Sequence, residues 1–343
     1  MIEILEYTDA IKESWDSYVQ DSTSATIAHQ AGWRKVINKS LGHKPVYILA
    51  MENGKIAGIL PIFKIKTWWG TRSIVSIPWL DYGGVIADSE EIALKLLLRA
   101  GEITREYKAE FIEYRSIQTA DPDLPVSREK VSFWLELEKD SDALWKRFDG
   151  KLRNQIRKSD KSGLTTTLGG TEQIASFYEV FSHNMRDLGT PVWGRDFFEN
   201  ILNEFSDDAK IILVKSADKV IAGGLVLYFK DRIYVPSASS YRDYIKMCPN
   251  HALYWSLIKS GCEQGYKYFD FGRSGINSNT YNFKKQWCPE STQLNWQYYL
   301  NTLNEIPTVN PTNPKYHLII NIWRKLPISV ANFLGPKVIR NFP

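Results

Sequence analysis

The stretch YKYFDFGRSGINSNTYNFKKQWC (266–288) gathers residue types that could do chemistry. It begins as an apolar run that contains Asp270, ends in Gly-Arg-Ser, and continues through a turn-rich segment to Lys284. The planar guanidinium of Arg273 suits a phosphate or a carboxylate, and a salt bridge that closes a strand end explains it equally well. Asp270 alternates with two phenylalanines and so faces away from them, either as a general base or as the buried partner of Arg273. We favour the partner.

A sheet must present these groups at one edge. In open α/β sheets, ligands bind beyond the carboxyl ends of the strands. The sequence predicts a strand over 266–272, which places Arg273 and Ser274 at such an end. Lys284 follows closely enough to fold back over it. The alternative is a surface lysine beside a core phenylalanine, and residue type alone favours that alternative.

One unit occurs twice in the chain. PVYILAMENGKIAGILPIF (45–63) resembles KIILVKSADKVIAGGLVLYF (210–229), and each is typical of a β-hairpin. EYKAEFIEYRS (106–116) resembles GYKYFDFGRS (265–274), and each is typical of a strand that ends in Arg-Ser. Two matched pairs in the same order indicate a duplicated domain.

The second copy predicts an alternation of strands and helices. Its strands are predicted at 131–138, within 210–229, and at 231–238, 266–272 and 293–300; its helices at 141–162, 171–188, 195–205 and from an Asn250 cap to about residue 265. The strand–helix–strand crossover near the end calls for parallel pairing. We therefore expect an α/β (mixed α+β) fold with mixed sheets.

Length and composition favour two ordinary globular domains. The chain has 343 residues, of which 43% are hydrophobic and 24% charged. We expect a first domain at 1–128, a second at 129–304, and a linker and apolar basic tail at 305–343.

The three cysteines lack metal-ligand spacing, and reduced thiols in the cytoplasm are the simplest explanation. We see neither a secretory signal nor an apolar stretch long enough to span a bilayer.

Positive charge concentrates in two places. Residues 146–163 hold seven Lys or Arg and two Asp, and the residues after 305 hold five Lys or Arg and no acid. Arg153 and Arg157 are one helical turn apart and share a face. A net charge of +4 is too small to imply nucleic acid, so we expect no DNA partner. A solvated helix face explains most of these side chains.

Several segments carry a resemblance to a known family. They are SIPWLDYGG (76–84), MRDLGTPVWGRDFF (185–198), PNHALYW (249–255), FDFGRS (269–274), YNFKKQW (281–287) and the terminal residues 313–343. The chain resembles the FemAB-like transferases, which carry two GNAT acyltransferase folds in tandem. It is most similar to the branch associated with exopolysaccharide and exosortase (PEP-CTERM) systems, with BioF2-like acyltransferase domains. The resemblance implies two tandem GNAT-like domains.

The resemblance also implies roles for individual residues. A Phe-Lys pair is a recurrent active-site element of the family, and here it falls on Phe283 and Lys284; we add Asp270 as a third catalytic candidate. The substrate-binding candidates are Arg273, Ser274, Tyr281, Thr190, Trp193, Asp81, Tyr82, Arg153, Arg157 and Asn250. The alternatives for Thr190 and Trp193 are a plain interhelical turn, and for Asp81 and Tyr82 a tight turn. We expect no metal.

Acyl transfer to an amine needs donors for an oxyanion, a base for the amine proton, and cations for phosphate. We therefore expect an N-acyl or aminoacyl transferase that acts on a nucleotide- or lipid-linked sugar of the cell envelope or exopolysaccharide. The donor is acyl-CoA or aminoacyl-tRNA. No glycine lies between Ser240 and Trp255, so the usual coenzyme A loop is not supported, and no long helical arm supports tRNA. The alternatives are a non-catalytic binding module and, less favoured, nucleic-acid binding.

The tail at 316–343 allows two interpretations. Leu-Pro and Gly-Pro steps break its apolar segments, which flank Arg324 and Lys325, so neither segment can cross a membrane. A basic apolar segment of this kind suits peripheral contact with the inner face of the membrane. Docking on the second domain as a lid is the alternative, and the one we favour.

Overall fold

The computed structural model describes residues 1–288, 290–307 and 314–342. Its contacts divide the chain into two compact units. Unit 1 comprises Met1–Val131, Gln293–Val309 and Arg340–Pro343, and unit 2 comprises Ser132–Thr292 and Asn310–Ile339. Of the linker expected at 305–314, residues 308–313 lie outside the described part.

Unit 1 is built on a mixed sheet with strand order β1-β2-β3-β4-β6-β15-β7, and β5 pairs with β3. The strands are β1 (Ile2–Glu6), β2 (Lys44–Glu52), β3 (Lys55–Lys66), β4 (Arg72–Val75), β5 (Ile86–Ala87), β6 (Phe111–Tyr114), β7 (Val126–Ser127) and β15 (Trp296–Leu300). The helices are η1 (Asp9–Ile11), α1 (Lys12–Asp21), η2 (Ile27–His29), α2 (Trp33–Leu41) and α3 (Glu90–Glu106). Strand β4 runs parallel to β6, as the crossover through α3 requires.

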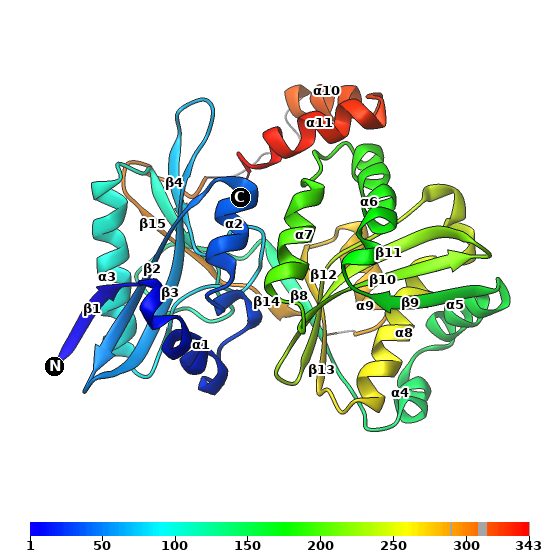
Figure 1. Ribbon diagram of the computed structural model, residues 1–343, viewed down its shortest axis with the longest axis horizontal. Coiled ribbons are helices and arrows are strands. Elements are labelled where there is room, and N and C mark those ends of the chain that lie inside the picture. Colours follow the sequence, from blue (N-terminus) through cyan, green and yellow to red (C-terminus); the bar gives the residue numbers. More distant parts are fainter. Residues whose placement is uncertain (289, 308–313, 343) are drawn as a thin grey trace. The chain divides into compact units, whose positions relative to one another are not determined.

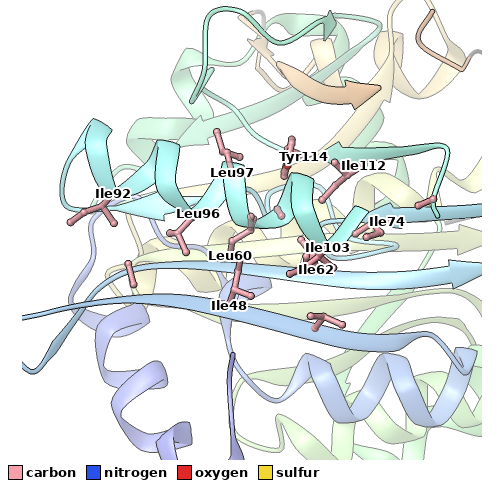
Figure 2. Close-up of a cluster of buried hydrophobic side chains, with 14 of the residues drawn as sticks. Ile48, Leu60, Ile62, Ile74, Ile92, Leu96, Leu97, Ile103, Ile112 and Tyr114 are labelled. Atoms are coloured by element: carbon pink, nitrogen blue, oxygen red, sulfur yellow. The ribbon is translucent and has the colours of Figure 1, made fainter. Parts of the chain in front are cut away.

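The core of unit 1 lies between α3 and the sheet. Figure 2 shows Leu96 and Ile103 of α3 beside Ile48, Leu60 and Ile62 of β2 and β3. All five side chains are 1% exposed or less, which makes this layer the main apolar contact of the helix. An aromatic cluster on α1, β2 and β3 contributes further buried side chains: Trp15, Tyr47 and Phe63.

Unit 2 has a second mixed sheet, with strand order β14-β8-β13-β12-β11-β10-β9. The strands are β8 (Lys130–Glu136), β9 (Leu164–Gly169), β10 (Ala209–Ser216), β11 (Lys219–Phe229), β12 (Arg232–Ser240), β13 (Tyr268–Gly275) and β14 (Thr292–Gln293). The helices are α4 (Ser141–Arg147), α5 (Gly150–Lys161), η3 (Thr171–Gln173), α6 (Ile174–Leu188), α7 (Arg195–Glu204), η4 (Arg242–Met247), α8 (Pro249–Glu263), α9 (Asn279–Lys285), α10 (Pro314–Trp323) and α11 (Ile328–Ile339). Helices α6 and α8 both pack on β10, β11 and β12 (Figure 1).

The two sheets share one topology. Read from β1 and from β9, the orders β1-β2-β3-β4-β6-β15-β7 and β9-β10-β11-β12-β13-β8-β14 correspond strand for strand. Both contain a parallel pair at the matching place, β4 with β6 and β12 with β13. Both predicted hairpins form, and Asn53 and Gly54 adopt the positive φ angles of 51° and 77° that such a turn needs. The internal repeat in the sequence therefore corresponds to a repeated fold.

The last strand differs from the prediction. The sequence predicts 293–300 as the final strand of the second copy, but β15 pairs with β6 and β7 of unit 1. Strand β8, which begins at the end of the first segment of unit 1 and was predicted for the second copy, takes the corresponding place in the sheet of unit 2. Buried Gln297 contributes to the choice, because its side-chain carbonyl accepts a hydrogen bond from the Ala120 amide at 2.7 Å. Alternation of apolar residues identifies a strand but not its partner.

Two further differences lie between 141 and 169. The predicted helix at 141–162 is broken into α4 and α5, because Phe148 is extended and Asp149 caps α5 by accepting a hydrogen bond from the Leu152 amide at 2.6 Å. The ring of Phe148 packs against Trp255 and Trp287. Strand β9 was not predicted, although three consecutive threonines are typical of a strand.

Candidate functional site

The parallel pair of unit 2 separates partway along its length. Pairing between β12 and β13 covers Arg232–Tyr234 and Tyr268–Asp270, yet both strands continue beyond it. Val235 and Pro236 together stand opposite one residue of β11, which is a β-bulge. Pro236 has no N–H to donate to a neighbouring strand. The bulge and the proline therefore account for the end of the pairing and leave the last residues of β13 without β12 as neighbour.

Lys284 lies at this end of β13. Helix α9 begins after Ser278, whose hydroxyl accepts a hydrogen bond from the Tyr281 amide, and Lys284 is in its last turn. The ammonium of Lys284 donates to the carbonyl of Gly272 at 2.9 Å and to the carbonyl of Arg273 at 2.8 Å. The residue is only 8% exposed. It thus folds back over the strand end, and its charge is held in place by two backbone groups.

Asp270 is fully buried in the sheet. Its Oδ1 accepts hydrogen bonds from the Gly272 amide at 2.8 Å and from the Ser132 hydroxyl at 3.2 Å. The guanidinium of Arg232 lies 3.6 Å from its Oδ2 and also stacks over Trp134. The sequence interpretation offers Arg273 as the ionic partner and misses Arg232, which the parallel register places on the neighbouring strand. These contacts give Asp270 a structural role; its catalytic role stays a prediction.

An aromatic cluster surrounds His251 beside α9. The ring centroid of His251 is 5.2 Å from that of Phe283 and 5.9 Å from that of Trp287. Tyr254 contacts the rings of both Phe283 and Trp287. Burial lowers the pKa of His251 to about 4, so the imidazole is neutral at physiological pH. Its Nε2 is buried and has no hydrogen-bond partner among the described residues. A lone histidine is usually a structural residue whose ring nitrogens are hydrogen-bonded. His251 differs from that expectation, because its Nε2 has no such partner among the described residues.

The first turn of α8 corrects a predicted cap. The sequence predicts Asn250 as the N-cap, but Cys248 takes that position in a left-handed conformation and Pro249 is the first helical residue. Proline is favoured there because its missing N–H would have no partner in a first turn. The Cys248 thiol donates to Gln155 of α5 at 2.8 Å. Asn250 lies within the turn, and its buried Oδ1, like the hydroxyl of Ser274, has no hydrogen-bond partner in the described part of the chain.

The remaining candidates of unit 2 lie on other elements. Tyr281 packs edge-on against Phe133. Arg157 is exposed, and its guanidinium lies over the ring of Trp145. Arg153 is half-buried as a residue, and its Nε atom is buried without a hydrogen-bond partner among the described residues. Their roles in binding stay predictions.

Thr190 and Trp193 belong to the α6–α7 loop. The Trp193 carbonyl accepts a hydrogen bond from Tyr178 of α6 at 3.0 Å, and its ring packs on Phe197 of α7. A neighbouring residue of this loop, Val192, lies against Gly335 of α11. The contacts seen for this loop are therefore with α6, α7 and α11, and they do not link it to Lys284.

Asp81 and Tyr82 lie in the β4–β5 loop of unit 1. Both are buried, at 3% and 5% exposed. Ile77 and Trp79 of this loop have φ angles of 49° and 76°, a strained conformation for side chains of their size. Arg115 holds the loop by donating to the Leu80 carbonyl at 3.1 Å. Strain of this kind often accompanies function, and a ligand role for the loop stays a prediction.

The neutral state of His251 predicts how stability depends on pH. A histidine whose folded pKa is about 4 resists protonation that the unfolded chain accepts below about 6.5, so acidification favours unfolding. When the pH is lowered from ~7 to ~5, the protonation of this histidine in the unfolded chain should reduce the free energy of unfolding by about 2 kcal/mol. His251→Phe should abolish that contribution in urea titrations at the two pH values. The matched control is His183→Phe, since His183 lies on another helix, α6. A His251 variant that loses stability as steeply as the parent would contradict the assignment.

Comparisons with known proteins bear on the fold. Residues 146–285 match the family described as the acetyltransferase (GNAT) domain. A crystal structure of FemX is 16% identical with a TM-score of 0.64, covering 93% of this chain and 100% of that one. The C-terminal DUF2156 domain of an Agrobacterium fabrum protein described as a lysylphosphatidylglycerol synthetase is 14% identical, with a TM-score of 0.57 and coverage of 85% and 92%. A tandem GNAT protein from the clavulanic acid biosynthesis pathway is 9% identical, with a TM-score of 0.53 and coverage of 88% and 98%. No curated protein matches the sequence.

These likenesses confirm the predicted fold class. The chain is a mixed α+β protein with two mixed sheets of the GNAT type in tandem. The segment matched by the GNAT family contains the bulge of β12, the end of β13 and Lys284. At these sequence identities the likenesses concern the fold, and the chemistry must be argued from the site. In the described ranges, no group of His, Cys, Asp and Glu side chains is placed to hold a metal ion.

Proposed function

We propose that this protein is an N-acyl or aminoacyl transferase whose reaction centre lies at the end of β13 in unit 2. The observation that carries the proposal is the buried ammonium of Lys284, fixed by the carbonyls of Gly272 and Arg273 where β12 and β13 cease to pair. A charge held rigidly at a strand end stabilises developing negative charge without reorganisation. The match of this segment to the acetyltransferase family supports acyl transfer as the reaction.

The reaction joins an amine to an acyl group. The amine nitrogen attacks the acyl carbonyl, a C–N bond forms, and the C–S or C–O bond to the donor breaks while the amine gives up a proton. Lys284 would stabilise the oxyanion or a donor phosphate beside it. The neutral imidazole of His251 next to Phe283 is a candidate acceptor for the amine proton, because its Nε2 has no hydrogen-bond partner in the described part of the chain. Ser274 and Asn250 offer further polar atoms to a ligand.

The acceptor we propose is a nucleotide- or lipid-linked sugar of the cell envelope or exopolysaccharide. The resemblance to FemAB-like transferases supports this class, as does the likeness to FemX. The name of the lysylphosphatidylglycerol synthetase describes aminoacyl transfer to a lipid headgroup, a related reaction. Arg153, Arg157 and Arg273 would supply cations for the phosphates of such an acceptor.

The donor is acyl-CoA or aminoacyl-tRNA. The segment between β12 and α8 is a short 3₁₀ helix, Arg242–Met247, followed by Cys248 and Pro249, and it contains no glycine. Pro249 removes one N–H from the first turn of α8, where coenzyme A phosphates would otherwise find donors. A coenzyme A donor would therefore bind differently from the usual form. The same feature favours the second candidate function, a binding module of this fold without turnover.

One experiment separates transfer from binding. Purified protein is incubated with an amino-sugar nucleotide and either acetyl-CoA or aminoacyl-tRNA, and products are read by mass spectrometry. We expect an acylated acceptor with one donor and none with Lys284→Met. Tight binding of the acceptor by calorimetry, with no product from either donor, would replace the transferase proposal by the binding module.

A further inference from the structure

The C-terminal helices α10 and α11 form a pair that packs on α6 (Figure 1, orange and red). A Cβ on Gly189 would stand 2.5 Å from Ile320, and one on Gly335 would stand 2.7 Å from Val192, so the backbones approach closely at both places. Arg186 of α6 donates to the Leu326 carbonyl at 3.1 Å between the two helices. Trp323 is 8% exposed. One side of the pair is thus docked on unit 2, as expected for a lid.

The same helices also expose large apolar side chains. Ile319 and Ile322 of α10 are 56% and 54% exposed, and Phe333 of α11 is 65% exposed. Val330 and Leu334 add smaller exposed areas. Side chains of this size are usually buried, and several on one short helical pair mark an interaction surface. We call these five residues the tail patch.

The tail's own charged residues have one sign. No Asp or Glu occurs in the sequence after Glu305. Lys325 is exposed in the turn between the helices, and the ammonium of Lys337 lies 3.7 Å from the ring centroid of Phe333. A segment that is basic, contains no acidic residue of its own and exposes apolar side chains matches an anionic lipid headgroup layer. Such a surface would repel a second copy of itself, which disfavours a symmetric dimer through it.

Unit 1 carries a second surface of the same chemistry. The turn between β3 and β4 exposes Trp68 and Trp69, at 63% and 61%. Phe342 packs on Trp69 at 5.8 Å, and the side chain of Asn341 accepts a hydrogen bond from the Trp68 amide at 2.9 Å. The sequence from residue 53 to residue 80 holds four Lys or Arg and no acid. Tryptophan prefers the boundary between lipid and water, which makes this turn an independent indication.

We propose that the protein binds the surface of an anionic bilayer through the tail patch, with Trp68 and Trp69 as a second lipid-contacting element. Binding is peripheral, because no helix within the described ranges is both long and apolar enough to span a bilayer. The tail would then contact the rest of unit 2 by one side and lipid by the other, so the two sequence interpretations are compatible. The inference goes beyond the proposed transfer reaction and does not depend on it.

Vesicle flotation tests the inference with the full chain. We expect the protein to float with vesicles that contain phosphatidylglycerol, to be released by high salt, and to remain unbound with phosphatidylcholine alone. The double substitution Ile322→Asn with Phe333→Ser should lower partitioning at least about tenfold, since two large interfacial side chains are lost. The double substitution Lys325→Glu with Lys337→Glu should abolish the salt-sensitive part of vesicle binding. Trp68→Ser with Trp69→Ser should weaken binding separately.

Leu98→Ser is the matched control. Leu98 is 69% exposed on α3 and lies next to Arg99, which pairs with Glu102 and Glu106, so its surroundings are of mixed charge. This variant should float like the parent, and Lys284→Met should float too, which separates lipid binding from the transfer reaction. A parent protein that stays unbound at low salt, or variants of both surfaces that bind like the parent, would overturn the proposal. A dimer by light scattering that becomes a monomer on Phe333→Ser would assign the tail patch to a protein interface instead.

Discussion

Lys284→Met is expected to lower the rate of transfer by roughly 10²–10³-fold, the usual effect of removing one preorganised charge from a transition state. Methionine has a similar length and fits a position that is 8% exposed. It leaves the carbonyls of Gly272 and Arg273 without the ammonium that now binds them, so the free energy of unfolding should also fall, by about 1–3 kcal/mol. Circular dichroism and urea titration would verify that the variant remains folded under assay conditions.

The next residue provides the control. Lys285 is in the same turn of α9, but it is exposed, and its ammonium lies 5.9 Å from the ring centroid of Tyr281. Lys285→Met should keep turnover within about twofold, because an exposed charge is largely screened by solvent. If both variants lost activity equally, a general electrostatic effect of α9 would replace the specific role of Lys284. If neither lost activity, the reaction centre would lie elsewhere.

Closeness to a strand end along the chain suggested that Lys284 could fold back over it, but residue type alone favoured a surface lysine, and the family resemblance was what favoured a site residue. An apolar run ending in Gly-Arg-Ser marks a strand end, and a short helix brings the next lysine back over it. The contacts of Asp270 could not be predicted in this way. Arg232 becomes its neighbour only through the parallel register of β12 with β13, which no feature near Asp270 specifies.

His251 was missed for a different reason. A lone histidine in an apolar helix has no spacing that marks it, and a satisfied core position is the usual outcome. Its significance lies in what surrounds it in space, the rings of Phe283 and Trp287, together with a ring nitrogen that has no hydrogen-bond partner in the described ranges. The PNHALYW segment did mark the region, and Pro249 was the better signal for where the helix begins.

The repeat could be predicted, but the exchange of strands could not. Matched hairpins showed that the domain is duplicated, and the two sheets do share one strand order. The strand predicted at 131–138 for the second copy does belong to unit 2, as β8, but unit 1 takes its sixth strand, β15, from beyond the second copy in the chain. Both segments alternate apolar and polar residues, so each satisfies either sheet by pattern, and only tertiary contacts such as those of Gln297 decide.

Arg115 occupies in unit 1 the position that Arg273 has in the repeat, and its removal should have the largest effect on stability. Its side chain is 2% exposed, lies 2.6 Å from the Glu113 carboxylate, and stacks on Trp296 at 4.6 Å. Arg115→Met should lower the free energy of unfolding by about 3–5 kcal/mol, because it leaves Glu113, whose side chain is 12% exposed, without its cation and frees the Leu80 carbonyl. Urea titration measures the loss, and faster amide exchange in residues 76–84 would show that the loop has been released.

An exposed pair with the same separation isolates the contribution of burial. Arg147 and Glu138 are also 2.6 Å apart, but their side chains are 51% and 41% exposed. Arg147→Met should therefore cost less than about 1 kcal/mol, because solvent already screens both charges. Glu113→Gln added to Arg115→Met should recover part of the loss, since the uncompensated carboxylate is then gone. Equal losses from Arg115→Met and Arg147→Met would mean that burial does not strengthen the pair, and that the strained β4–β5 loop is held by its other contacts, such as the hydrogen bond from the Thr26 hydroxyl to the Tyr82 carbonyl at 2.9 Å.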